Sequence, residues 1–258
     1  MPEIDLIVSD IDGCLTSGKT EPLDLARLED LKRYNRSTVD TGLPPLSLCT
    51  GRPQPYVEAF CQILSIQHPC ICENGALLYD PQKDCTIYHP DIDPGLVSDI
   101  NTLKTLIIEN ISPILPFTIE PGKDICLSIN PAHNSHTASS VTELFERVTN
   151  LATDFNVNVT HSKSAVDITP KGIDKGAGLT FLSTYVGVPA SRIAGIGDSA
   201  GDRPFLSLAK YSAAPSNADT EIKSIVDYAS PLAHLAGVID IIHNNFNLNH
   251  GHTTFHNS

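Results

Sequence analysis

Ile4-Asp5-Leu6-Ile7-Val8 runs directly into Ser9-Asp10-Ile11-Asp12-Gly13 near the start of the chain. The first stretch is mostly apolar and β-branched, and the second holds two aspartates and a glycine. Together they predict a buried strand that ends in a tight loop. Leucines at positions 25, 28 and 31 then recur at helical spacing among charged residues, which predicts an amphipathic helix. The chain is therefore expected to begin with a strand, a polar loop and a helix.

The same alternation of strand and helix returns along the chain. Further short apolar runs predict strands at 46–49, 70–72, 193–196, 211–214 and 227–229, and apolar periodicity predicts helices at 57–64 and 176–185. Strands that alternate with helices at this spacing form parallel sheets through right-handed crossovers. We therefore expect an α/β fold with a Rossmann-like, doubly wound parallel sheet as its core.

The rhythm changes between residues 84 and 167. Helical patterns at 96–111 and 141–155 alternate there with extended pieces at 117–120, 124–129, 157–160 and 165–169. The alternating apolar and polar residues of 123–129 are typical of a sheet with one covered face. We expect a separate α/β module at 84–167, inserted into a discontinuous core formed by 1–83 and 168–258.

The composition limits the partners and the compartment. Lys and Arg number 17 against 30 Asp and Glu, a formal net charge of −13. Nucleic acids and anionic membranes bind basic surfaces, so neither is an expected partner. Seven cysteines are too sparse for a disulfide framework, and the chain shows no signal segment and no membrane-spanning run. These features predict a soluble, cytoplasmic protein.

Polar residues follow directly on three of the expected strands. Asp10 and Asp12 follow the first strand, Thr50 follows the second, and Asp198 and Asp202 follow the strand at 193–196. The carboxyl ends of the strands form the ligand crevice of an open parallel sheet, so these side chains should meet there. Four carboxylates would repel one another without a cation, and Mg²⁺ is the ion that such hard oxygen ligands favour.

Four segments resemble the ordered motifs of the haloacid dehalogenase superfamily. They read DIDGCLT at 10–16, TGR at 50–52, KG at 175–176 and GDSAGD at 197–202. The insert between the second and third segments resembles the large α/β cap (type IIB) of the Cof-type phosphatase branch. That branch includes sucrose-phosphate and archaeal phosphoglycolate phosphatases, and ENGA at 73–76 is also similar to it.

The resemblance implies a role for each matching residue. Asp10 is the expected nucleophile, which forms an aspartyl-phosphate, and Asp12 is the expected general acid and base. Thr50 and the amide of Gly51 are expected to bind the phosphoryl oxygens. Lys175 is expected to neutralise charge on the transferring group; Lys171, in a similar loop, is the alternative.

The resemblance also implies a metal site. Mg²⁺ is expected on Asp10, the carbonyl of Asp12 and Asp198, with Asp202 supporting it through water or through Lys175. Gly201 stands where this branch usually has asparagine, so metal affinity or phosphate positioning is expected to differ.

In such proteins the cap closes over the core and contacts the leaving group. The candidate specificity residues are Arg52 and Asn74, whose loops border the crevice, and Lys123 in the insert. A chain without tryptophan and with 6% aromatic residues offers little stacking surface, which favours a small polar leaving group such as a sugar or hydroxy acid.

The expected function is a Mg²⁺-dependent phosphomonoesterase for small phosphorylated metabolites, chiefly sugar phosphates, as a monomer or small homo-oligomer. One alternative is a phosphomutase of the phosphomannomutase type, which would use the same aspartyl-phosphate. The other is a non-catalytic binding module that retains the fold. The His- and Asn-rich residues 243–258 are expected to be a polar tail.

Overall fold

The computed structural model describes residues 3–132, 138–162 and 164–246, and three sheets organise them. Most of the expected polar tail, residues 247–258, lies outside the described residues. None of the helices within the described ranges is long and apolar enough to cross a membrane.

A five-stranded parallel sheet forms the centre of the core, in the order β12-β11-β10-β1-β2. Its strands are β1 (Leu6–Ser9), β2 (Leu46–Leu48), β10 (Ile193–Ile196), β11 (Tyr211–Ala214) and β12 (Tyr228–Ala229). Ser9, at the end of β1, lies opposite both Leu48 and Ile196, so the carboxyl ends of three neighbouring strands are level. The order of the strands along the chain reverses between β10 and β1, which is where such sheets bind ligands.

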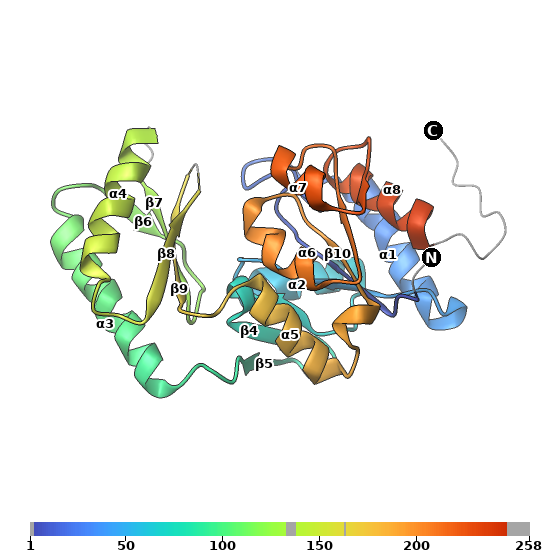
Figure 1. The fold of residues 1–258 in the computed structure, drawn as a ribbon, viewed down its shortest axis with the longest axis horizontal. Coiled ribbons are helices and arrows are strands. Elements are labelled where there is room, and N and C mark those ends of the chain that lie inside the picture. The colour runs from blue at the N-terminus through green and yellow to red at the C-terminus, as the bar shows by residue number, and fades with distance from the viewer. Residues whose placement is uncertain (1–2, 133–137, 163, 247–258) are drawn as a thin grey trace.

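Helices cover both faces of this sheet (Figure 1). One face packs against α1 (Leu25–Thr41), α2 (Gln54–Leu64) and α8 (His234–Phe246), and the other against α5 (Lys175–Val186), α6 (Arg203–Leu208) and α7 (Thr220–Ile225). Successive side chains of β1 point to opposite faces of the sheet and contact both helix layers. Ile7 packs in the apolar cluster with α1, α2 and α8, whereas Leu6 and Val8 pack in the cluster with α5, α6 and α7. The expected doubly wound α/β core is confirmed.

The strand at 70–72 does not continue the parallel sheet as expected. β3 (Cys70–Cys72) makes one parallel bridge, between Cys49 and Ile71, and then pairs antiparallel with β4 (Leu77–Asp80), which pairs with β5 (Cys85–Tyr88). A three-residue 3₁₀ turn, η1 (Glu73–Gly75), reverses the chain between β3 and β4. β4 is fully buried, so its apolar run shows no alternation by which the sequence could have marked it as a strand.

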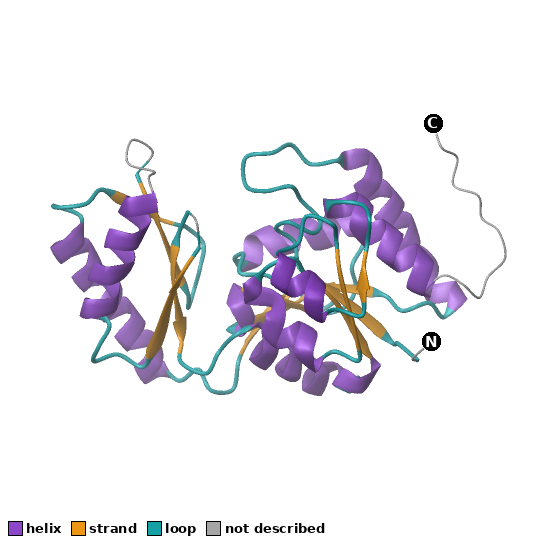
Figure 2. Ribbon diagram, turned by 45° about the horizontal axis from the view of Figure 1, so that its top comes forward, coloured by secondary structure: helices purple, strands orange, loops and turns teal. Residues whose placement is uncertain are grey.

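The insert has its own sheet and core. Its strands, in the order β6-β7-β9-β8, are β6 (Phe117–Ile119), β7 (Leu127–Pro131), β8 (Val157–His161) and β9 (Val166–Pro170). The helices α3 (Pro94–Ile111) and α4 (Ala138–Leu151) cover one face, and the other face is turned toward the core (Figures 1 and 2). The expected boundary at 83/84 lies before β5, which pairs with β4, and that at 167/168 lies inside β9. We propose that the insert begins after β5 and ends after β9.

Candidate active site

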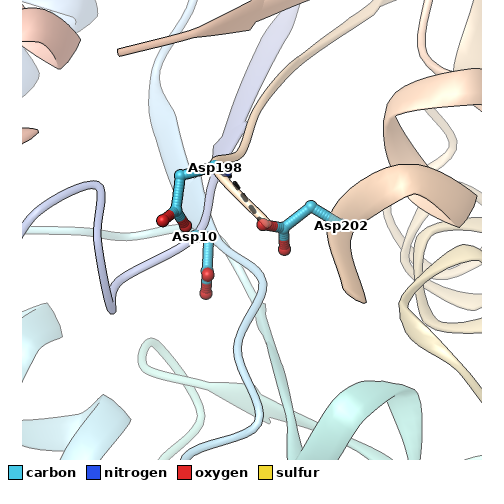
Figure 3. Close-up of side chains that lie close together, drawn as sticks. All are labelled: Asp10, Asp198 and Asp202. Atoms are coloured by element: carbon cyan, nitrogen blue, oxygen red, sulfur yellow. Dashed lines mark hydrogen bonds between the residues drawn. The ribbon is translucent and has the colours of Figure 1, made fainter. Parts of the chain in front are cut away.

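Asp10 and Asp198 emerge side by side from the level ends of β1 and β10. The amide N–H of Asp10 donates a hydrogen bond to the carbonyl of Ile196 at 2.9 Å, which ties the two strand ends together. Carboxylate oxygens of Asp10, Asp198 and Asp202 all lie within 4.8 Å of one another (Figure 3). The structure thus brings together three of the four carboxylates that the sequence placed in one crevice.

Gly13 allows the loop after β1 to pass close to Asp198. Its φ is +89°, and a Cβ atom there would lie 2.1 Å from a carboxylate oxygen of Asp198. The close contact excludes a side chain at this position, and the positive φ independently favours glycine. Asn217 donates a hydrogen bond to the carbonyl of Gly13 at 2.9 Å, and His234 Nδ1 lies 3.2 Å from the same oxygen. Asn217 in the loop after β11 and His234 at the start of α8 therefore hold the loop that carries Asp10 and Asp12.

Lys175 is a buried cation between two carboxylates. It is the first residue of α5, and Asp174 caps that helix by accepting the amide N–H groups of Gly176 and Ala177. Lys175 Nζ lies 3.0 Å from Asp10 Oδ1 and donates to Asp202 Oδ1 at 2.6 Å. Burial alone would lower the pKa of this amine, but Asp10 and Asp202 raise it above its ordinary value, so the amine stays charged.

The alternative cation, Lys171, is exposed just beyond β9. It has no place beside Asp10, so the structure brings Lys175 and not Lys171 to the candidate site.

Asp202 uses both carboxylate oxygens within the protein. Oδ1 accepts from Lys175, and Oδ2 accepts from the amides of Asp198 and Ser199 and from the Ser199 hydroxyl. The bond from the Ser199 amide is one half of the capping box of the short 3₁₀ turn η4 (Ala200–Asp202), and the Asp202 amide completes it by donating to the Ser199 side chain. Asp202 therefore orients the loop and Lys175. Because its oxygens already accept four hydrogen bonds, few lone pairs are left for direct contact with a metal ion.

Asp10 and Asp198 have the properties of a cation-binding site. Asp198 Oδ1 is buried without a hydrogen-bond partner among the residues that the structure describes, and Asp10 Oδ1 has only its ion pair with Lys175. Burial is the main cause that raises the pKa of Asp10 well above its ordinary value; for Asp198 burial, reinforced by Asp202, raises the pKa to about 7. Buried, unpartnered carboxylate oxygens are costly unless a cation compensates them. The donor set therefore fits a hard divalent ion such as Mg²⁺.

The loop after β2 holds Thr50, Gly51 and Arg52 next to Asn74. The amide of Thr50 donates to the carbonyl of Ile71, and the amide of Asn74 donates to the carbonyl of Thr50, both at 3.0 Å. The Thr50 hydroxyl accepts the Arg52 amide at 3.1 Å, which leaves its own proton free to donate. A Cβ atom on Gly51 would lie 2.8 Å from Asn74 Oδ1, so glycine at 51 lets Asn74 approach the loop.

Arg52 grips Asp12. Its Nε and Nη2 each donate to an Asp12 carboxylate oxygen at 2.6 Å, a bidentate arrangement that fixes orientation as well as distance. The guanidinium also lies 3.5 Å from Glu120 of the insert and stacks over Tyr56, 4.6 Å from the ring centre. The sequence suggested Arg52 as a specificity residue alone, whereas the structure also makes it the partner of Asp12.

A cavity of about 810 Å³ opens between the core loops and the insert. Its lining includes Asp12 and Gly51 of the core and the three candidate specificity residues Arg52, Asn74 and Lys123. The insert supplies further polar lining residues, among them Thr118, Glu120, Ser128, Asn130, Ser162, Ser164 and Asp167. The cavity thus has Asp12 of the candidate site on its core side and a polar wall on the insert.

Sequence reasoning missed Glu120. Its carboxylate lies 3.2 Å from Lys19, 3.5 Å from Arg52 and 3.7 Å from Lys123, so cations from both parts of the chain converge on it. The only local signal is its place before the Pro121-Gly122 turn, which says nothing about distant cations.

Comparisons with known proteins agree with this architecture. The sequence profile of the haloacid dehalogenase-like hydrolases matches residues 7–115 and 108–242. Similar proteins include phosphoglycolate phosphatases of Methanothermobacter thermautotrophicus, 25% identical over 236 residues, and of Methanopyrus kandleri, 26% identical over 224 residues. The first alignment covers 92% of this chain and 96% of the relative, and the second covers 86% and 88%.

Solved structures share the whole fold at lower identity. A protein of Thermoplasma acidophilum matches with a TM-score of 0.73 and 21% identity over 94% of this chain and 98% of its own. A haloacid dehalogenase-like hydrolase from Bacteroides thetaiotaomicron matches with a TM-score of 0.71 and 20% identity over 95% of this chain and 100% of its own. These solved chains therefore share the fold of both the core and the insert over almost their whole length.

Proposed function

The chain belongs to the haloacid dehalogenase-like hydrolases, and from this premise we propose that it is a Mg²⁺-dependent phosphomonoesterase that forms an aspartyl-phosphate. The observation that carries the proposal is the meeting of Asp10 and Asp198 with Lys175 at the reversal point of the sheet, where one buried oxygen of Asp198 has no partner among the described residues. A site with this charge distribution suits a phosphoryl group together with a divalent cation.

In the first step Asp10 attacks phosphorus. A bond forms between a carboxylate oxygen and phosphorus while the bond from phosphorus to the leaving alcohol breaks. Asp12 protonates the departing oxygen, so that an alcohol and not an alkoxide leaves. Arg52 positions the Asp12 side chain in the cavity through two hydrogen bonds to its ionised form, and one Asp12 oxygen must leave Arg52 to carry the proton that is used in this step.

In the second step water attacks the phosphorus of the aspartyl-phosphate. Asp12, now ionised, takes a proton from the water, and the bond between Asp10 and phosphorus breaks to release inorganic phosphate. Lys175 neutralises charge at Asp10 in both steps, and Asp202 holds the lysine in place. The Thr50 hydroxyl and the Gly51 amide are the proposed donors to the phosphoryl oxygens.

Asp10, the backbone carbonyl of Asp12 and Asp198 are the proposed Mg²⁺ ligands, with Asp202 in a supporting position. When bound, the ion would supply positive charge that lowers the repulsion between these carboxylates and a phosphate. This proposal also accounts for an acidic protein that accepts an anion, because the local field at the site and not the net charge determines binding.

The cavity supports a small polar leaving group. Carboxylates, hydroxyls and an amide line the insert side, and they suit the hydroxyl groups of a sugar. The relatives named phosphoglycolate phosphatase favour a phosphorylated hydroxy acid. We therefore propose small phosphorylated metabolites as the substrate class, with sugar phosphates and phosphorylated hydroxy acids as its two candidate groups.

Hydrolysis of p-nitrophenyl phosphate with and without Mg²⁺ tests the activity, followed by a panel of phosphoglycolate, phosphoglycerates and phosphorylated sugars. The wild type should release phosphate only when Mg²⁺ is present. The Asp10→Asn variant should release no phosphate, with or without Mg²⁺. Absence of hydrolysis across the panel would contradict the proposal. Turnover that needs a sugar bisphosphate and returns the phosphoryl group to a sugar would instead identify a phosphomutase.

A further inference from the structure

Glu73 of the core binds three consecutive backbone amides of the insert. It is 1% exposed and lies in the turn directly after β3. Its Oε1 accepts the N–H of Asp124 at 2.8 Å, and its Oε2 accepts the N–H groups of Ile125 and Cys126 at 2.9 and 2.8 Å. Both oxygens of one core carboxylate are therefore used to hold one loop of the insert.

The turn that carries Glu73 is built to aim it at the insert. Glu73, Asn74 and Gly75 have φ values of +48°, +57° and +103°, three successive residues in the left-handed region. Such a run costs energy for residues other than glycine and persists where surrounding contacts enforce it. Here the amide of Glu73 donates to the carbonyl of Arg52 at 3.1 Å, and a Cβ on Gly75 would lie 2.2 Å from the carbonyl of Asp174.

This turn points two adjacent side chains in different directions. Asn74 approaches Gly51 in the loop after β2, whereas Glu73 reaches the insert. One short turn thus connects the phosphate-binding side of the candidate site with the wall of the cavity.

The bound amides immediately follow Lys123. The side chain of Lys123 is 4% exposed, lines the cavity and donates to the Ser128 hydroxyl at 2.5 Å. Ser128 in turn donates to Asp167, another residue of the cavity wall. The position of residues 124–126 on the core therefore determines where Lys123, Ser128 and Asp167 lie relative to Asp12 and Arg52.

Breaking the contact would be costly. A buried carboxylate that loses its donors keeps the full penalty of its lost hydration, and hydrogen bonds to a charged group are stronger than those between neutral groups. Burial raises the pKa of Glu73, and the three amides and Lys123 oppose that rise by favouring the ionised form. The loop should therefore stay on Glu73 while the protein is folded.

We propose that Glu73 is a positioning residue that docks residues 123–126 of the insert on the core and thereby sets the place of Lys123 in the substrate cavity. The docking concerns the folded protein itself, whereas its effect on catalysis rests on the proposed function. A purely structural residue of similar burial would stabilise the fold without a specific effect on substrate affinity, and this difference can be measured.

Asp80 offers a matched control. It is a buried carboxylate of β4 that also accepts backbone amides, those of Gln82 and Lys83, as well as the Tyr185 hydroxyl. Its partners all belong to the core. Asp80→Asn should therefore reproduce the general cost of altering a buried carboxylate without affecting the docked loop.

Hydrogen exchange at the amides of 124–126 tests the docking without any substrate. Glu73→Ala should speed their exchange about tenfold or more, as expected for the loss of charge-assisted hydrogen bonds, and Glu73→Gln should have a smaller effect because one oxygen remains. Asp80→Asn should leave these amides unchanged. Wild-type amides that exchange freely, or amides unaffected by Glu73→Gln and Glu73→Ala, would overturn the proposal.

Kinetics on the panel substrate with the lowest wild-type KM test the effect on the cavity. Glu73→Ala should raise KM about tenfold or more while kcat changes less than about threefold, and Lys123→Ala should do the same. In the double variant the effects should not add, because Glu73 acts through Lys123. Additive effects, or a loss of kcat shared with Asp80→Asn, would overturn the positioning role. A wild type inactive on every substrate would contradict the proposed function, and the exchange experiment would still decide the docking.

Discussion

Lys175 Nζ lies 2.6 Å from Asp202 Oδ1, and both groups are almost completely excluded from solvent. The other oxygen of Asp202 holds the loop that carries Asp198, so this one ion pair connects the start of α5 with the end of β10. The pair orients the charges of the candidate site as well as joining two elements of the core.

Lys175→Met should abolish detectable phosphatase activity and destabilise the metal-free protein by about 3–5 kcal/mol, because it leaves Asp10 and Asp202 buried without their cation. Urea unfolding and the p-nitrophenyl phosphate assay measure the two effects. The exposed Lys171→Met is the control and should change neither. Unaltered stability of Lys175→Met would show that the carboxylates do not depend on this lysine.

The carboxylates at the site should make stability depend on pH and Mg²⁺ together. In the folded protein the pKa of Asp198 is raised from 3.8 to about 7, and that of Asp10 is also raised. Because the folded state binds these protons more tightly than the unfolded state, the free energy of unfolding contributed by Asp198 falls as the pH rises from about 4 to 7. Mg²⁺ should offset that loss.

Thermal unfolding should therefore show a larger increase in Tm with saturating Mg²⁺ at pH 8 than at pH 5.5, where protons compete with the ion. Asp198→Asn should remove most of this pH dependence. An equal Mg²⁺ effect at both pH values would contradict the assignment of Asp198 as a ligand.

Arg52 should be needed for its shape as well as its charge. Arg52→Lys keeps the charge but cannot make both hydrogen bonds to Asp12, so kcat should fall about tenfold; Arg52→Ala should lower it about a hundredfold. Arg192→Lys is a suitable control, because Arg192 pairs with Asp5 at the far end of β1. Wild-type kcat for Arg52→Lys would mean that the orientation of Asp12 does not depend on the bidentate contact.

Gly201 should accept asparagine, the residue that the family resemblance leads us to expect at this position. The residue is exposed, and an added Cβ atom would meet only Ser199 Oγ, at 3.7 Å. Gly201→Asn should keep the Tm within a few degrees and lower the Mg²⁺ concentration for half-maximal activity, because it adds a polar group near the ion. Gly201→Ala is the control for replacing glycine without adding a polar group. If both variants respond to Mg²⁺ in the same way, the side-chain amide of the asparagine has no role.

The sequence carried the core of the site because its residues follow strands directly. Asp10 and Asp198 each come one or two residues after a short apolar run, and the carboxyl ends of adjacent parallel strands must lie together. Lys175 was named from the resemblance to the third family motif and from its place directly before a predicted helix, which the structure confirms as the start of α5. For such residues, the position next to a strand or helix along the chain is enough to predict their place in the site.

Other features required the packed structure. Arg52 was recognised from its loop, but its two bonds to Asp12 and its approach to Glu120 depend on how the insert sits over the core. Glu120 has no strand end or motif that would mark it. Similarly, β4 and β5 extend the small sheet beside β3, but their sequences show no alternation of apolar and polar residues that would predict strands.

The amino-acid sequence by itself determined the doubly wound core, the insert and the acidic residues at the strand ends, because these follow from local periodicity and from the geometry of parallel sheets. Only the tertiary structure decided that Glu73 binds the amides of residues 124–126, about fifty positions along the chain. Backbone amides carry no side-chain identity, so no pattern of residue types could have marked them as partners of a buried carboxylate. The wall of the cavity depends on contacts of this kind, and they form only when two parts of the chain pack together.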